Sequence, residues 1–376
     1  MKKVTATGFF AVVFFLLAGK RTCAQDIVDK NATAETRNLF KNLMRLSRQH
    51  ILFGHQDALA YGVGWKNITG MSDVRSVTGE HPAVYGWDLG HLELDSSRNL
   101  DGIPFAKMKQ YMKQGYQRGG VITISWHLRN PVNGKSAWDT TPGSVAAIIP
   151  GGHKHELFKT WLDKVAAFIK DLKGTRGEPI PVLFRPYHEL TGNWFWWCRN
   201  VSTADEFKKL WRFTVDYLKK EKGVHQLLYV FNTADFTTTD NFLERYPGDD
   251  YADVISFDLY QHGPKDKDHF RTEVRRRLLL LQKLGEEKGK LTAFAETGYE
   301  AIPDAGWWTE TLLPAIAHTG ISYVLAWRNH GYMPWNKKMH YYVPYSGQVS
   351  AADFIKFCRQ PQVMLEKKIK AENIYR

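Results

Sequence analysis

The sequence predicts a single (β/α)₈ TIM barrel for the mature chain, and three observations lead to that fold class. Eight short apolar runs recur after residue 50, each apolar on both faces and rich in β-branched or aromatic residues, as buried parallel strands are. Amphipathic helical patterns separate most of these runs, and strands that alternate with helices indicate a parallel sheet. Neither a Pro-, Gly- or Ser-rich linker nor a change of composition divides the 376-residue chain, which favours one closed barrel.

The chain begins with a predicted signal peptide over residues 1–24. Lys2 and Lys3 precede an apolar run over 9–18, and small residues then allow cleavage after Ala24. Lysine and arginine stand before Cys23, where lipoprotein processing prefers small apolar residues, so we expect simple cleavage. The mature protein, 25–376, is therefore expected to be exported, either to the periplasm or out of the cell.

The predicted elements follow the signal peptide in a regular order. An amphipathic helix over 34–48 is expected to close the bottom of the barrel, and the segment 128–153 is too long for an ordinary loop, so we place it at the rim of a cleft. The predicted strands are 51–56, 83–88, 121–127, 181–189, 227–232, 253–260, 291–297 and 323–329. The predicted helices between them are 104–118, 155–172, 204–222, 270–288 and 307–318, with a shorter one near 240–246.

Every predicted strand ends in polar, ionisable or aromatic residues. Chemistry in a barrel of this kind lies at the C-terminal ends of the strands, so these side chains are expected to converge on one site. In chain order the strand ends are Gly54-His55-Gln56, Trp87-Asp88, Trp126-His127, His188-Glu189, Asn232, Asp258 with Tyr260, Glu296, and Trp327-Arg328.

Two of these strand ends carry a glutamate suited to acid–base chemistry. Glu189 follows the fourth strand and Glu296 lies at the end of the seventh, so the two carboxyl groups can face each other across the barrel mouth. Glycoside hydrolysis uses such a pair: one group protonates the departing oxygen while the other attacks or stabilises the sugar carbon. Tryptophans near Glu189 offer apolar faces on which sugar rings can stack. Carboxyl groups beside indole rings therefore predict a saccharide cleft.

The motifs around both glutamates resemble glycoside hydrolase family 26, whose commonest members are β-mannanases. RPYHELTGNWFWW over 185–197, FAETGY around Glu296 and the early FGHQ carry the resemblance, which covers nearly the whole mature chain. The resemblance implies a retaining enzyme that cleaves β-1,4-mannosidic linkages in mannan or galactomannan by double displacement. It implies that Glu189 is the acid/base and Glu296 the nucleophile of a catalytic domain over 25–376.

The resemblance also implies roles for six substrate-binding residues. His188 stands where the wider clan usually has an asparagine that contacts the sugar near its 2-hydroxyl, and Trp194 matches a sugar-stacking tryptophan. Tyr260 matches a tyrosine that holds the nucleophile. His127, Trp327 and Arg328 match positions that line the non-reducing side of the cleft.

Other residues near the predicted site have more ordinary interpretations. Arg185 is expected to orient a carboxylate, and Asp88 and Asp258 are expected to act as hydrogen-bond partners rather than catalysts. His55 fits a core position and a sugar contact equally well. The sequence leaves open whether three further tryptophans belong to the core or to the cleft: Trp126, Trp196 and Trp197.

Several other functions are disfavoured by the sequence. His153, His155 and Glu156 lie close together, but their sequence lacks the HExxH spacing of a zinc site. We also find no GxSxG elbow, phosphate loop or dinucleotide fingerprint. No metal or cofactor is therefore expected. The formal charge is +12, and it falls to +8 once the four cations of the signal peptide are removed. Much of this charge lies in helical runs that also contain acidic residues. We find no recognisable nucleic-acid-binding module in the sequence. No stretch after the signal peptide predicts a membrane span.

Some alternatives stay open at this point. A β-xylanase or mixed-linkage β-glucanase of the same family would use the same carboxyl pair, and a non-catalytic saccharide-binding barrel would keep the tryptophans without needing that pair. The sequence does not decide between endo action and mannobiose release, and it leaves galactose tolerance and oligomeric state open. Spacing alone does not show whether Cys198 and Cys358 form a disulfide.

Overall fold

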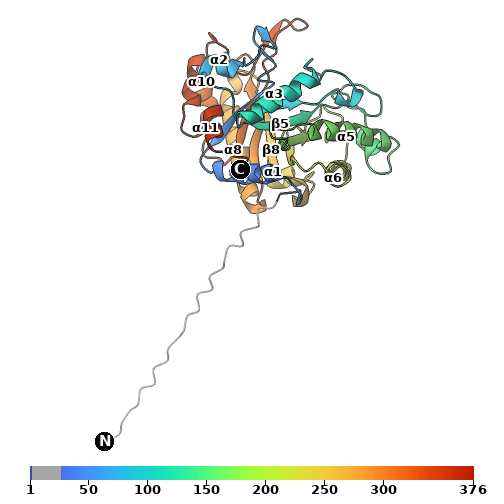
Figure 1. Cartoon of the computed structure of the whole chain (residues 1–376). Helices are drawn as coiled ribbons and strands as arrows, with labels where there is room; N and C mark the ends of the chain where they lie inside the picture. Colours follow the sequence, from blue (N-terminus) through green and yellow to red (C-terminus); the bar gives the residue numbers. More distant parts are fainter. Residues whose placement is uncertain (2–26) are drawn as a thin grey trace.

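A computed structural model describes Met1 and residues 27–376 of the chain (Figure 1). The predicted signal peptide lies outside the described residues except for Met1. No helix in the described part of the chain is long and apolar enough to cross a membrane. Cys198 and Cys358 are both buried free thiols, so the structure contains no disulfide between them.

Eight parallel strands form a closed barrel, which confirms the predicted fold class. Each strand pairs in parallel with its neighbours in chain order, and the last strand pairs with the first through Leu52–His55 and Tyr323–Ala326. The barrel strands are β1 (Ile51–Gln56), β4 (Val84–Asp88), β5 (Val121–Trp126), β6 (Val182–Pro186), β7 (Leu227–Thr233), β8 (Val254–Gln261), β9 (Leu291–Tyr299) and β10 (Tyr323–Ala326). The two-residue strand β13 (Val363–Met364) pairs with β1 as well.

Helices surround this barrel as the sequence pattern predicts. Two of the predicted helices contain π-helical turns: 217–221 continues α6, and 308–312 precedes α9. The α-helices are α1 (Ala34–Leu46), α2 (Asp73–Thr78), α3 (Phe105–Gln117), α4 (Ser144–Ile148), α5 (His155–Lys170), α6 (Ala204–Asp216), α7 (Thr239–Leu243), α8 (Lys267–Lys288), α9 (Leu313–Ile316), α10 (Ala351–Cys358) and α11 (Glu366–Ala371).

Helix α1 closes the bottom of the barrel, as expected for an amphipathic N-terminal helix (Figure 1). The side chain of Thr33 caps its first turn by accepting a hydrogen bond from the backbone N–H of Thr36 (3.2 Å). Its buried apolar side chains Leu39 and Leu43 belong to the same core cluster as residues that begin the strands, such as Leu183 and Leu291. The bottom of the barrel is thus sealed, and its opposite end is left for a site.

The fourth barrel strand ends earlier than predicted. β6 stops at Pro186, whereas the apolar pattern predicts a strand that continues to residue 189. Tyr187 and Glu189 adopt left-handed backbone conformations (φ 51° and 54°), which a strand cannot accommodate. The chain therefore turns sharply just before the predicted acid/base residue.

Two short hairpins project beyond the C-terminal ends of the strands. The first pairs β2 (Tyr61–Gly62) with β3 (Trp65–Lys66) after β1, and the second pairs β11 (Gly331–Met333) with β12 (Lys338–His340) after β10. They lie at the top of the view in Figure 1, on the opposite side of the barrel from α1.

Candidate active site

A cavity of about 380 Å³ opens where the barrel strands end. It lies between side chains that follow or end β5, β6, β8, β9 and β10, so the ends of five of the eight barrel strands line one cavity. Seven of the eight predicted site residues line it: His127, His188, Glu189, Trp194, Tyr260, Glu296 and Trp327.

Glu189 and Glu296 approach each other across this cavity from the fourth and seventh strands of the barrel. One carboxyl oxygen of each, together with one of Asp258, forms a cluster in which all three atoms lie within 4.8 Å of one another. Carboxyl pairs of retaining glycosidases are about 5–5.5 Å apart, whereas inverting pairs are about 6.5–9.5 Å apart to admit a water molecule. Oxygens of Glu189 and Glu296 that lie within 4.8 Å of each other are closer than an inverting pair requires.

Glu189 is held in its left-handed conformation by a residue of the next strand. The backbone N–H of Glu189 donates to Oδ1 of Asn232 (2.8 Å), and Nδ2 of Asn232 donates to Oδ1 of Asp258 (2.8 Å). Trp197 adds a hydrogen bond from its indole Nε1–H to the carbonyl of His188 (2.8 Å). A left-handed non-glycine residue costs roughly 1–3 kcal/mol and persists only where its surroundings enforce it, as these bonds do here.

The carboxyl group of Glu189 stays protonated at higher pH than an ordinary glutamate. Burial and the neighbouring charge of Glu296 raise the pKa of Glu189 to about 7, although the indole Nε1–H of Trp194 donates to its Oε2 (2.6 Å) and favours the charged form. Trp194 can reach this carboxyl group because Gly192 has no side chain: a Cβ there would lie 2.7 Å from the indole ring. Near neutral pH, Glu189 can therefore donate a proton.

Glu296 is fixed from two sides. Nη2 of Arg185 forms an ion pair with its Oε1, and the hydroxyl group of Tyr260 donates to its Oε2 (2.8 Å). Arg185 also binds Oδ2 of Asp258 through Nη1 (2.8 Å), so one buried guanidinium group holds both carboxylates. This confirms the expectation that Arg185 orients a carboxylate and that Asp258 is a hydrogen-bond partner.

The three carboxyl groups are the described residues that come closest to a metal site. Carboxylate oxygens at this spacing are suitable ligands for a hard cation. However, Arg185 already supplies a positive charge to Asp258 and Glu296, which leaves only Glu189 without an ion pair. The arrangement is thus better suited to proton transfer than to holding a divalent ion.

The raised pKa of Glu189 predicts a pH-dependent stability. The folded state binds this proton more tightly than the unfolded state, so the free energy of unfolding falls as the pH rises from about 4.5 to about 7. Glu189→Gln cannot ionise and still offers an oxygen to Trp194. We expect it to stabilise the protein by about 1–3 kcal/mol at pH 8 and to leave the stability unchanged at pH 4.

Thermal unfolding at both pH values checks this expectation. Glu286→Gln, on the exposed side of α8, is the matched control and should have no effect at either pH. A Glu189→Gln protein with the same melting temperature as the wild type at pH 8 would contradict the electrostatic description of this cluster.

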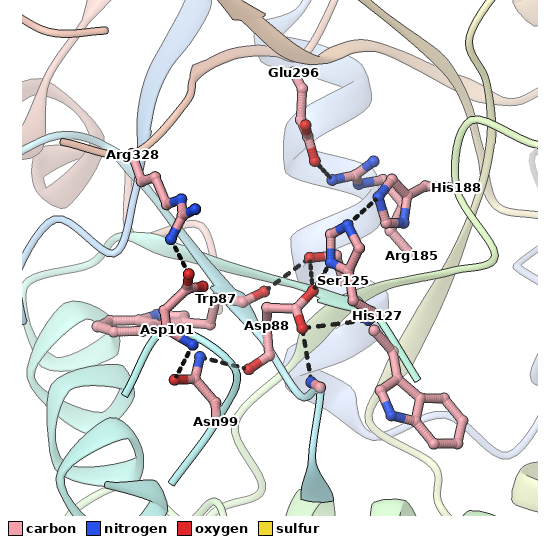
Figure 2. Close-up of polar contacts among 12 residues, drawn as sticks. Trp87, Asp88, Asn99, Asp101, Ser125, His127, Arg185, His188, Glu296 and Arg328 are labelled. Carbon is pink, nitrogen blue, oxygen red and sulfur yellow. Dashed lines mark hydrogen bonds and ion pairs between the residues drawn. The ribbon is translucent and has the colours of Figure 1, made fainter. Parts of the chain in front are cut away.

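A chain of hydrogen bonds runs from Asp88 through His127 to His188, the residue that precedes Glu189 (Figure 2). Oδ2 of Asp88 lies 2.7 Å from Nδ1 of His127, and Nε2 of His127 lies 3.1 Å from Nε2 of His188. Burial opposes the charge of His127, but Asp88 outweighs it, so the pKa of His127 is raised; burial, Arg185 and His127 lower the pKa of His188 well below its usual value. A protonated His127 can therefore donate to a neutral His188.

Asp88 anchors this chain, which agrees with its predicted supporting position. Despite its burial, hydrogen bonds and charge from His127, with further hydrogen bonds from Ser125 and the backbone of Gly90, lower the pKa of Asp88 to about 2. Its negative charge is therefore permanent near neutral pH, and it fixes the orientation of His127.

The sequence matches one family over most of its length. The profile of Glycosyl hydrolase family 26 matches residues 28–303. A mannan endo-1,4-beta-mannosidase of Bifidobacterium adolescentis is 31% identical over 91% of this chain, and one of Thermothelomyces thermophilus is 29% identical over 73% of it. The chain belongs to glycosyl hydrolase family 26. It spans only 36% and 52% of the lengths of these two relatives.

Solved structures of family 26 share this fold. A beta-mannanase from Bacteroides ovatus is 44% identical, with a TM-score of 0.85 over 89% of this chain and 96% of that one. The catalytic domain of a Bacillus endo-beta-1,4-mannanase is 33% identical, with a TM-score of 0.85 over 93% of this chain and 96% of that one. The resemblance identified from the two glutamate motifs is thus confirmed.

Arg328 is the one predicted site residue of this family 26 chain that does not line the cavity. Its guanidinium group instead forms an ion pair with Asp101, which lies in the loop after β4 (Figure 2). Trp327, the preceding residue, does line the cavity, so Arg328 stands at its edge. No strand pattern identifies Asp101, because it lies thirteen residues beyond the end of its strand.

The three tryptophans with undecided positions are fully buried. Nε1 of Trp196 donates to the carbonyl of Leu128 (3.1 Å), and Nε1 of Trp126 donates to the carboxylate of Glu93 (3.1 Å). With Trp197 beneath His188, they support the loops of the site rather than line it. His55 is also buried, and this burial lowers the pKa of its imidazole to about 3.

Several lining residues were not predicted as site residues. Trp138 stacks on His127 with ring centroids 5.1 Å apart, so the segment 128–153 does contribute to the rim of a cleft. Phe195 lies within the glutamate motif itself and packs against His188. Tyr342 follows β12, in a segment whose sequence shows neither the alternation of a strand nor the periodicity of a helix. The other unpredicted lining residues are Gln261, His262, Tyr299 and Glu300.

Proposed function

We propose that residues 25–376 form a retaining glycoside hydrolase domain that cleaves β-1,4-mannosidic linkages in mannan or galactomannan. The spacing of the Glu189 and Glu296 carboxyl groups carries this proposal, because an oxygen of each lies within 4.8 Å of the other in a cavity lined by aromatic rings. The mannosidase names of the related proteins support the choice of mannan.

In the proposed reaction Glu189 is the acid/base and Glu296 the nucleophile. Glu296 attacks the anomeric carbon as the glycosidic bond breaks, and the departing oxygen takes the proton of Glu189. Water then hydrolyses the glycosyl ester, with its proton passing to Glu189. The raised pKa of Glu189 supports the first step, and the bonds from Arg185 and Tyr260 hold Glu296 in position for attack.

Other lining residues are proposed to bind the sugar. Trp194 is half-exposed beside Glu189, where its ring can stack on a sugar face. His188 is neutral, and its Nδ1 has no partner among the described residues, which leaves it available to a hydroxyl group. His127 and Trp327 complete the wall, and Arg328 is proposed to reach a sugar at the cavity edge.

A panel of polysaccharides tests the proposal. We expect the purified mature chain to release reducing sugar from linear mannan and galactomannan, with EDTA present and no metal added. Preferential hydrolysis of xylan or mixed-linkage glucan would identify the alternative substrates, and binding without hydrolysis would identify a saccharide-binding barrel. Loss of activity in EDTA that a divalent ion restores would contradict the mechanism.

The hydrogen bond from Trp194 to Glu189 predicts a shift in pH dependence. Trp194→Phe keeps an aromatic face but removes the Nε1–H that stabilises the carboxylate, so the pKa of Glu189 should rise above about 7. Loss of kcat/KM at alkaline pH should therefore begin at higher pH than in the wild type. The pH profile of kcat/KM measures the shift, and an unchanged alkaline limb would show that the bond has no effect on this proton.

We also propose that residues 1–24 are removed during export to the periplasm or the medium. Sequencing the N-terminus of the protein recovered from those fractions should show a chain that begins near Gln25.

A further inference from the structure

We propose that a second hollow, between the β2–β3 and β11–β12 hairpins, binds an additional hexopyranosyl unit of the same polysaccharide. The inference depends on the proposed function, because it assigns to that substrate a second contact beyond the reacting sugars. The hollow has a volume of about 400 Å³ and includes Tyr61 and Trp65 from one hairpin and His330 and Tyr332 from the other.

Exposed aromatic side chains occur at two places only in residues 27–376. Four tryptophan, tyrosine or phenylalanine side chains are exposed in this part of the chain, and two of them, Trp138 and Trp194, line the active-site cavity. The other two are Tyr332, which lines the hollow, and Trp335, which lies in the same hairpin. They are 56% and 71% exposed, so two large aromatic faces lie at the surface beside the hollow.

An aromatic contact links the two hairpins. The rings of Tyr61 and His330 meet edge to face at 6.2 Å, and His330 in turn contacts Trp335 at 5.4 Å. Gly331 has a left-handed backbone (φ 87°), and a Cβ there would lie 3.8 Å from the carbonyl oxygen of Gly62. The exposed rings of Tyr332 and Trp335 therefore lie on a hairpin that packs against the β2–β3 hairpin, next to the hollow.

The polar groups of the hollow suit hydroxyl groups of a neutral sugar. Lys66 offers an ammonium group, and the carboxylate of Asp101 lies at the wall of the hollow, paired with Arg328. The indole of Trp65 and the ring of Tyr332 supply apolar faces. Nε of Arg328, which pairs with Asp101, is buried without a hydrogen-bond partner among the described residues. Mixed charge with aromatic faces is typical of a carbohydrate site.

The hollow and the active-site cavity are joined through one ion pair. Asp101 lines the hollow and binds Arg328, and Arg328 follows Trp327, which lines the cavity. Figure 2 shows Arg328 and Asp101 on one side of the view and Glu296 with Arg185 on the other. A polysaccharide that lies in the cavity and extends past Arg328 can thus place a further unit in the hollow, either from its backbone or from an α-galactosyl branch.

The test compares short and long substrates with variants of the exposed rings. We expect Trp335→Ala and Tyr332→Ala to fold normally and to lower kcat/KM on mannohexaose, linear mannan or galactomannan by about three- to tenfold. Hydrolysis of mannotriose and mannotetraose should be unchanged. Leu279→Ala, which removes an exposed apolar side chain from α8, is the control and should alter neither.

Each outcome decides the inference. Loss on unbranched long substrates assigns the hollow to a backbone unit, and loss on galactomannan alone assigns it to a galactosyl branch. Equal loss on short and long substrates in both variants, or no loss in either, would overturn the inference. A wild-type enzyme that hydrolyses none of the mannans would instead reject the proposed function, so the two failures are distinct.

Discussion

Glu296→Ala is expected to lower kcat on every β-mannoside by about 10⁴-fold or more. The proposed reaction forms a bond between this carboxylate and the anomeric carbon, and an alanine leaves no atom to form it. Activated aryl mannosides should be equally resistant, because a better leaving group does not replace the missing nucleophile. Initial rates on mannan and on a dinitrophenyl β-mannobioside measure the loss.

A matched variant separates this effect from a general disturbance of the cavity. Glu300→Ala removes another carboxyl group from the cavity lining, one that binds Nδ1 of His340 (2.8 Å). It should retain far more activity. Azide should act on Glu296→Ala by attacking in place of the carboxylate, giving an α-mannosyl azide. Comparable activity in the two variants would remove Glu296 from its proposed role.

Glu189→Ala is expected to show a different pattern, since general acid–base catalysis contributes about 10²- to 10⁴-fold. Hydrolysis of mannan should fall by that range because the departing oxygen needs a proton. A dinitrophenyl leaving group needs none, so formation of the glycosyl-enzyme from that substrate should stay fast and appear as a burst. Azide should then speed the second step by attacking without base assistance and yield a β-mannosyl azide.

The pH profile and product stereochemistry complete this test. The alkaline limb near pH 7, which reports the protonated fraction of Glu189, should be absent from the variant on the activated substrate. Proton NMR of the first product of the wild-type enzyme should show the β-anomer. An α-anomer would exclude double displacement, and a variant without a burst or azide response would exclude Glu189 as the acid/base.

The sequence was sufficient to predict the barrel and the convergence of five of its eight strand ends, because both depend on short-range patterns. Apolar runs of buried parallel strands and a polar residue after each run are visible without a structure. Glu189 and Glu296 were therefore placed opposite each other. The contacts around the two glutamates could not be predicted in the same way. The backbone N–H of Glu189 donates to Asn232, which lies on the next strand. A hydrogen bond between two strands produces no repeating pattern in the sequence of either one.

Residues carried by long loops were the least predictable part of the site. The sequence predicts a rim over 128–153, yet the stacking of Trp138 on His127 depends on how that segment folds back. Asp101 reaches Arg328 from a loop after a different strand, so neither residue indicates the other in the sequence. The early end of β6 also escaped the apolar pattern, because the left-handed turn at Tyr187 and Glu189 is imposed by tertiary contacts.

The close approach of the two carboxyl groups has a consequence for the timing of proton transfer. Part of the raised pKa of Glu189 comes from the negative charge of Glu296. In the proposed glycosyl-enzyme that charge is lost, because the carboxylate of Glu296 has become an ester. The pKa of Glu189 then falls, and the residue that was an acid in the first half-reaction becomes available as a base in the second. In the proposed mechanism, forming the covalent bond thus lowers the proton affinity of Glu189, so one residue can act as acid and then as base.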